Sequence, residues 1–115
     1  MGGFFGAASE NNCITDVFFG TDYHSHLGTR SAGLTMWDKE KGFHREIHSI
    51  SNAPFRTKFE KELDEMAGTS GIGCISDAEP QPIIVRSHLG DYSIIITGFV
   101  ANTNALAERY LARHN

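Results

Sequence analysis

The sequence predicts an α+β fold with a mainly antiparallel sheet, and two observations carry this prediction. Strand-like and helix-like segments follow one another in the order β-α-β-β-α-β-β-β-α. Two pairs of neighbouring strands are separated only by short glycine-containing turns, at 39–42 and 89–92, and such pairs form antiparallel hairpins. The chain has no internal repeat or linker, so residues 1–115 are expected to form a single domain.

The first strand and the first helix follow from apolar spacing. Residues 2–9 are a compact apolar run, which predicts a short buried strand. The next segment has apolar residues at helical spacing, namely Ile14, Val17 and Phe18, with Leu27 as a possible extension. Gly20 and Gly28 are expected to weaken or break this helix, because glycine is a poor helix former.

The first predicted hairpin joins residues 32–38 to residues 43–51. Side chains alternate between the two faces of a strand, so its second strand has two different faces. One face carries Phe43, Arg45 and Ile47, and the other carries His44, Glu46 and His48.

The clearest helix lies within residues 51–68. Its apolar stripe consists of Phe55, Phe59, Leu63 and Met66. Asn52 is expected to cap its start, Pro54 suits its first turn, and Gly68 is expected to end it. The acidic residues Glu62, Asp64 and Glu65 are interpreted as a solvated face of this helix.

The C-terminal half predicts a strand at 71–77, a loop at 79–82 and a second hairpin within 82–100. A last helix is expected to begin near Asn102 or Asn104. Alternate positions on the second hairpin are aliphatic, namely Ile83, Val85, Ile94 and Ile96. We call these four residues the hairpin strip.

Composition excludes several classes of function. The net charge of −4 and the absence of a basic run argue against nucleic-acid binding. No apolar stretch is long enough to span a membrane, and the N-terminus carries no signal-peptide pattern. Two cysteines do not suggest a disulfide framework, so the expected compartment is the cytoplasm.

The chemistry-bearing residues taken one at a time favour no metal and no cofactor. His44 and His48 are four apart on a strand, which separates them by roughly 13 Å. Asp22, His24 and His26 are better placed, although such residues are more often hydrogen-bonding groups than metal ligands. Cys13 and Cys74 lack a motif that lowers a thiol pKa, so they are interpreted as buried and inert. The segment GTSGIG lacks the lysine of a phosphate-binding loop.

Four segments, taken together and in order, are more specific. MGGFFG is similar to the motif M-C-G-[IV]-F-G, except at the cysteine. HLGTRSAG is similar to H-R-G-x-[ED]-[SA]-A-G through His26, Gly28, Ser31, Ala32 and Gly33. GIGCISD and PQP are similar to G-x-[GA]-H-x-R-[YW] and a Q-P loop through Gly71, Gly73, Gln81 and Pro82. IITGFVANTNAL is similar to A-x-[NH]-N-G-x-[IVL]-x-N through Gly98, Val100 and Asn102.

These motifs resemble the class II glutamine amidotransferase domain, the N-terminal-nucleophile (Ntn) hydrolase domain that begins the amidophosphoribosyltransferases of purine biosynthesis. The resemblance implies part of an αββα sandwich. The family domain is about twice as long, so the chain is expected to be its N-terminal portion, partnered by the rest of a longer protein or by a second copy. A half sandwich leaves a sheet face uncovered, so we expect a homo-oligomer that buries the hairpin strip.

Three departures from the family pattern concern the reacting groups. The family nucleophile is the cysteine after the initiator methionine, with its own α-amine as base, and this position is Gly2. The arginine that holds the glutamine carboxylate corresponds to Ser76, whose hydroxyl cannot form a bidentate ion pair. The oxyanion-hole asparagine before Gly98 corresponds to Thr97, which lacks the amide donor.

The interpretation that accounts for all three departures is a catalytically degenerate amidotransferase-like domain, with no intact catalytic residue and a structural or regulatory role. One alternative is a hydrolase with a relocated nucleophile at Cys13, Cys74 or Thr97. Another is a module that senses a glutamine-like small molecule in the degenerate cleft. The resemblance places Ser76, Gly98, His26 and Gly28 at that cleft.

Overall fold

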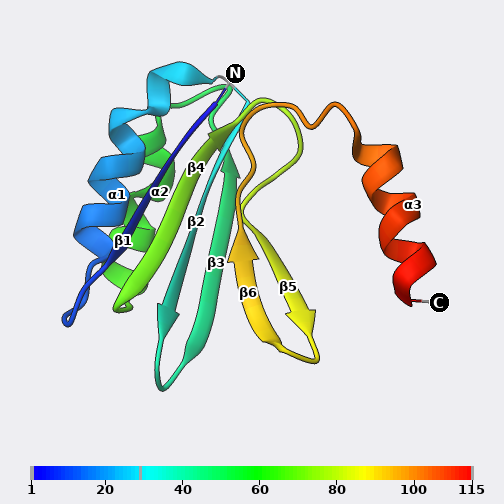
Figure 1. Cartoon of the computed structure of the whole chain (residues 1–115). Helices are drawn as coiled ribbons and strands as arrows, with labels where there is room; N and C mark the ends of the chain where they lie inside the picture. The colour runs from blue at the N-terminus through cyan, green and yellow to red at the C-terminus, as the bar shows by residue number, and fades with distance from the viewer. Residues whose placement is uncertain (1, 29, 115) are drawn as a thin grey trace.

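The computed structural model describes residues 2–28 and 30–114 and has the predicted α+β architecture (Figure 1). A four-stranded antiparallel sheet, which we call the main sheet, has the strand order β1-β4-β2-β3. A two-stranded antiparallel hairpin, β5-β6, forms a second sheet. Helices α1 and α2 cover one face of the main sheet, and α3 stands apart from both sheets (Figure 1).

The element bounds agree with the predicted order. The strands of the main sheet are β1 (Gly3–Ala8), β2 (Ser31–Asp38), β3 (Gly42–Ser49) and β4 (Ser70–Ser76). The hairpin consists of β5 (Ile83–Ser87) and β6 (Gly90–Ile94). The helices are α1 (Ile14–Tyr23), α2 (Phe55–Glu65) and α3 (Thr103–His114), and a short 3-10 helix covers Ser25–Leu27.

The core lies between the main sheet and the two helices that cover it. Its buried residues come from β2, β4 and both helices, and they include Val17, Phe18, Leu34, Met36, Phe55, Phe59 and Ile75. The rings of Phe55 and Phe59 stack with centroids 4.6 Å apart. The apolar stripe predicted for α2 therefore faces the sheet, as its spacing indicated.

The C-terminal third has no buried interior of its own. Among the residues whose burial is described, none after Pro82 is buried. The radius of gyration is 15.3 Å, whereas a compact domain of this length has about 13 Å. None of the described helices combines the length and the hydropathy that a membrane crossing requires.

Several local predictions were wrong at the element ends. Strand β1 is half exposed rather than buried, because its burial alternates along the strand and Phe4 faces outward. Gly20 lies inside α1 instead of breaking it. Pro54, not Asn52, occupies the N-cap of α2, and no side chain caps that end. The helix ends at Glu65, before Gly68, because Met66 already has extended backbone angles.

The acidic face predicted for α2 is also wrong in one position. Glu62 is buried, with 6% of its surface exposed, and lies between α2 and the sheet. Its Oε1 is 2.7 Å from Nε2 of His48 on β3. Asp64 and Glu65 are not buried. Glu62 thus places a carboxylate on the sheet-facing side of α2, although the sequence pattern assigned it to solvent.

Candidate functional site

A cavity of about 580 Å³ lies at the end of β4 where the strand leaves the main sheet. Four residues that the resemblance placed at one cleft line it together, namely Gly2, Ser76, Thr97 and Gly98. The strand register explains why two of these residues, Gly2 and Ser76, lie close together. Gly3 pairs with Ile75, so the adjoining Gly2 and Ser76 lie at the same end of the β1-β4 pair.

The loop after β4 brings the later segment to this end of the sheet. The amide side chain of Gln81 is buried, and its Oε1 accepts a hydrogen bond of 2.8 Å from the backbone N–H of Ile96. Gly33 on β2 makes room for this loop, because a Cβ there would meet the carbonyl oxygen of Gln81 and lie 2.7 Å from Cδ of Pro82. Two matched motif positions, Gly33 and Gln81, therefore build the wall that places Thr97 at the cavity.

Gly2 has no space for a side chain in this arrangement. A Cβ built on its backbone would meet the carbonyl oxygen of Ile75 and would lie 3.7 Å from Cγ2 of Thr97. Real Cβ atoms do not approach a carbonyl oxygen this closely, so any larger residue at position 2 requires the β1 backbone to shift. The backbone here therefore suits glycine.

Ser76 uses its hydroxyl within its own loop. Its Oγ donates a 2.8 Å hydrogen bond to the carbonyl oxygen of Glu79, and it accepts a hydrogen bond from the N–H of Ala78. The next residue, Asp77, accepts a hydrogen bond from the backbone N–H of Arg30. The Arg30 guanidinium donates to the backbone carbonyl of Asp77. Both contacts hold the loop against Arg30, which directly precedes β2.

Thr97 and Gly98 form the opposite, exposed side of the cavity. Gly98 has a φ of +118°, a backbone conformation that favours glycine. No heavy atom lies within 4 Å of a Cβ built at this position. The open space shows that Gly98 is required here for its backbone conformation and not for a close contact.

The remaining two cleft predictions lie beside the cavity. His26 is in the short 3-10 helix, and the described lining of the cavity does not include it. Gly28 packs behind the end of β4, because a Cβ there would be 2.6 Å from Cγ2 of Ile75 and 3.0 Å from Oδ1 of Asp77. Gly28 therefore supports the cavity wall, and His26 is not brought to it.

Sequence reasoning missed Asp77, Ala78 and Ile96 as lining residues. A usable signal existed for Asp77, because an acidic residue directly after a buried strand is placed at the strand's end, where sites form. No local signal marked Ile96, because its position follows from the hydrogen bond that its backbone makes to Gln81.

The two cysteines are buried, and neither belongs to the described lining of the cavity. Burial raises the pKa of Cys74 to about 11. The pKa of Cys13 is also raised, first by burial and then by the nearby carboxylate of Asp16. A thiol becomes a nucleophile only as its thiolate, so both environments oppose nucleophilic chemistry.

The described lining of the cavity contains no cysteine, histidine, arginine or lysine. The groups that it offers are the hydroxyls of Ser76 and Thr97, the amide of Gln81 and the carboxylate of Asp77. This set can donate and accept hydrogen bonds. It has no thiol for acyl transfer and no cationic side chain to hold a substrate carboxylate.

Comparisons with known proteins add the fold relationship. No protein-family model matches the chain, and no curated protein matches it. Among the solved structures that do match, two cover 100% of the chain, each with a TM-score of 0.77 and 19% sequence identity. One is the glutamine phosphoribosylpyrophosphate amidotransferase from B. subtilis in complex with ADP and GMP. The other is described as the allosteric regulatory enzyme of purine biosynthesis.

The chain therefore shares the fold of the matched part of these solved amidotransferase chains, and the predicted α+β class with antiparallel sheets is confirmed. The chain spans about a quarter of the length of the solved chains it matches, 26% in each case. At 19% identity the similarity establishes the fold alone.

Proposed function

We propose that the chain is a catalytically degenerate amidotransferase-like domain with a structural or regulatory role in an amidophosphoribosyltransferase-like protein. The observation that carries the proposal is the composition of the cavity. The residues corresponding to the family's nucleophile, carboxylate-binding and oxyanion positions meet at one cavity, and none carries the family's reacting group.

The backbone at position 2 adds independent support. A missing sulfur alone would leave the site otherwise ready for a side chain. Here the carbonyl oxygen of Ile75 occupies the direction in which a Cβ would point. The loop hydroxyl of Ser76 is likewise committed to Glu79 and Ala78. The backbone at Gly2 and the hydrogen bonds of Ser76 both fit the residues now present. This favours a structural role over the loss of the cysteine sulfur alone.

The test is a glutaminase assay on the purified chain. We expect no glutamate release above the buffer blank, because the described lining has no thiol and no histidine or lysine side chain to activate its two hydroxyls. The variants Cys13→Ala and Cys74→Ala are the matched controls for a relocated nucleophile. Activity in the unchanged chain that one of these variants abolishes would contradict the proposal and assign the nucleophile. Activity that survives both would contradict it and point to another group, with Thr97→Ala as the next variant.

A second candidate function is the sensing of a glutamine-like small molecule, and the persistence of a cavity of about 580 Å³ favours it. Binding would raise the melting temperature of the chain, because a ligand that binds only the folded state stabilises it. Asp77 makes the cavity better suited to the amino group of such a ligand than to its carboxylate. A melting shift with glutamine that Asp77→Asn removes would support sensing over a purely structural role.

The partner that the proposal implies is the rest of a longer protein or a second copy of the chain. The match to only 26% of each solved chain supports a role as one part of a larger assembly. The exposed apolar side chains of the C-terminal third support the same proposal, because a partner would bury them.

A further inference from the structure

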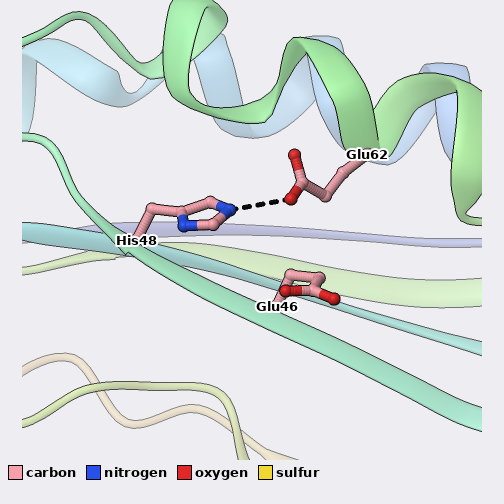
Figure 2. Close-up of side chains that lie close together, drawn as sticks. All are labelled: Glu46, His48 and Glu62. Carbon is pink, nitrogen blue, oxygen red and sulfur yellow. Dashed lines mark hydrogen bonds and ion pairs between the residues drawn. The ribbon is translucent and has the colours of Figure 1, made fainter.

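A cluster of three potential metal ligands lies on the helix-covered face of the main sheet, away from the cavity already described. Glu46 and His48 extend from β3, and Glu62 extends toward them from α2 (Figure 2). One ligand atom from each residue lies within 4.8 Å of the other two. The strand alternation that puts Glu46 and His48 on one face and the burial of Glu62 together create the cluster.

Glu62 provides a second and independent observation. Only 6% of its surface is exposed, and its carboxylate is directed from α2 toward the strand (Figure 2). Oε1 contacts Nε2 of His48, but the buried Oε2 has no hydrogen-bond partner among the described residues. A buried carboxylate oxygen without a partner is costly, and such an atom is a sign of an ion or water that belongs at the site.

The charges of the cluster also favour a bound cation. A histidine binds a metal ion through a neutral imidazole. With His48 in that form, Glu46 and Glu62 leave two negative charges at the edge of an apolar core that contains Phe59. One divalent cation neutralises both. A mixed set of imidazole and carboxylate ligands is typical of zinc sites that keep one position for water.

The surroundings of the cluster orient its side chains. Nε2 of His44 is 3.0 Å from Oε1 of Glu46, so a second histidine contacts this carboxylate. The ring of His48 packs edge-on against Phe59 with centroids 4.7 Å apart. Metal sites characteristically have such supporting contacts, which fix the direction of each ligand.

We propose that Glu46, His48 and Glu62 form a binding site for a divalent cation of the zinc class, which joins the edge strand β3 to α2. Two ligands of a tetrahedral zinc ion lie about 3.3 Å apart, whereas His48 and Glu62 are separated by 2.7 Å. Binding thus requires their direct contact to open slightly. Glu46 and His48 are partly exposed, which gives the ion access from solvent and lets Glu46 turn inward.

The experiment is calorimetric titration of the chelator-treated chain with zinc chloride, repeated with magnesium and calcium chloride. We expect one zinc ion per chain and a rise in melting temperature, with weaker binding of the other two ions. Glu62→Gln and His48→Gln should each weaken zinc binding at least about tenfold, since each removes a ligand. Glu46→Gln should also weaken zinc binding. Because Glu46 is partly exposed, this variant should fold even where Glu62→Gln does not, so it still tests the site.

The matched control is His88→Gln, which removes an exposed histidine from the β5-β6 turn. Zinc binding that is unchanged in this control and weakened in the three cluster variants supports the site. Cobalt substitution gives a further readout, because a cobalt spectrum without a thiolate charge-transfer band excludes Cys13 and Cys74 as the ligands. The proposal is overturned by a wild-type chain that binds no zinc, by binding that Glu46→Gln and His48→Gln leave unchanged, or by tighter binding of magnesium or calcium than of zinc.

Discussion

The helix-covered layer of the main sheet and the C-terminal third use similar side chains in opposite ways. The first contains Phe55, Phe59, Leu34 and Ile75, all of them buried. The second contains an equally apolar set that remains exposed, namely Ile83, Leu89, Tyr92, Ile94, Ile96, Phe99, Val100, Leu106, Tyr110 and Leu111. The difference lies in what covers each region and not in its composition.

The covered layer buries its apolar side chains because the apolar face of the main sheet packs against the apolar faces of α1 and α2. Helices α1 and α2 supply the second layer that a sheet face requires for burial (Figure 1). The other face of the main sheet meets the loop at Gln81 and Pro82 and the two-stranded hairpin. A cavity of about 760 Å³ lies between them, lined by residues that include Trp37, Phe43 and Tyr92. The C-terminal third thus has apolar surface without a layer to bury it.

The largest expected difference between the two regions is in stability. Phe59→Ala should lower the free energy of unfolding by about 3–5 kcal/mol, because it empties a fully buried ring position. Phe99→Ala is the matched control, since that ring is 91% exposed, and it should change stability by at most about 0.5 kcal/mol. Urea denaturation measures both.

Where Phe59→Ala does not fold, Phe59→Leu gives a smaller loss that is still measurable. Equal effects at Phe59 and Phe99 would contradict the contrast between the covered and uncovered regions.

The next difference is in thiol reactivity. Burial raises the pKa of Cys74 from 9.0 to about 11, and this leaves about a hundredfold less thiolate at pH 8. Iodoacetamide should therefore modify Cys74 at least about a hundredfold more slowly than a thiol introduced by Ser87→Cys, which lies on the exposed end of β5. The rate at Cys74 should rise as the pH increases toward 11, because only the thiolate reacts.

Mass spectrometry of the alkylated peptides separates Cys13, Cys74 and the introduced thiol. Rapid labelling of Cys74 in the folded chain, equal to that in urea, would show that the covered layer opens readily.

The smallest expected effect concerns association through the hairpin strip. Ile83 and Ile94 are cross-strand partners, and both are exposed together with Ile96, while Val85 is partly buried. We expect the chain to self-associate at micromolar concentration, because a second copy would bury this strip. Ile94→Asp should weaken association about tenfold, by placing a charge in the contact.

Sedimentation equilibrium measures the association, and Leu89→Asp is the matched control. Leu89 is an equally aliphatic, exposed residue at the tip of the same hairpin, outside the strip, so its change should leave the dissociation constant unaltered. A concentration-independent monomer mass for the unchanged chain would remove this prediction.

Much of the fold could be predicted because its signals are local. The spacing of Phe55, Phe59 and Leu63 defines a helix face, and the glycine-containing turns define two hairpins, without reference to the rest of the chain. The element ends were less predictable. Asn52 has the chemistry of a helix cap, yet α2 begins after Pro54 and uses no side-chain cap.

The candidate site was predicted by motif similarity rather than by spacing. That similarity identified Gly2, Ser76, Thr97 and Gly98, which the structure brings to one cavity. It also included His26, which lies outside the described lining. Asp77 and Ile96 were missed, because their positions depend on the loop after β4 and on the hydrogen bond from Ile96 to Gln81.

The amino-acid sequence by itself determined the α+β class and the order of the elements, and the resemblance led us to propose that the cleft positions lack reacting groups. Only the tertiary structure decided that Glu62 turns inward against His48, that a side chain at position 2 would meet Ile75, and that α3 stands apart (Figure 1). The physical reason is the distance along the chain over which each kind of interaction acts. Periodicity and turn chemistry act over a few residues, whereas burial and proximity depend on strand register and on which surfaces find a partner.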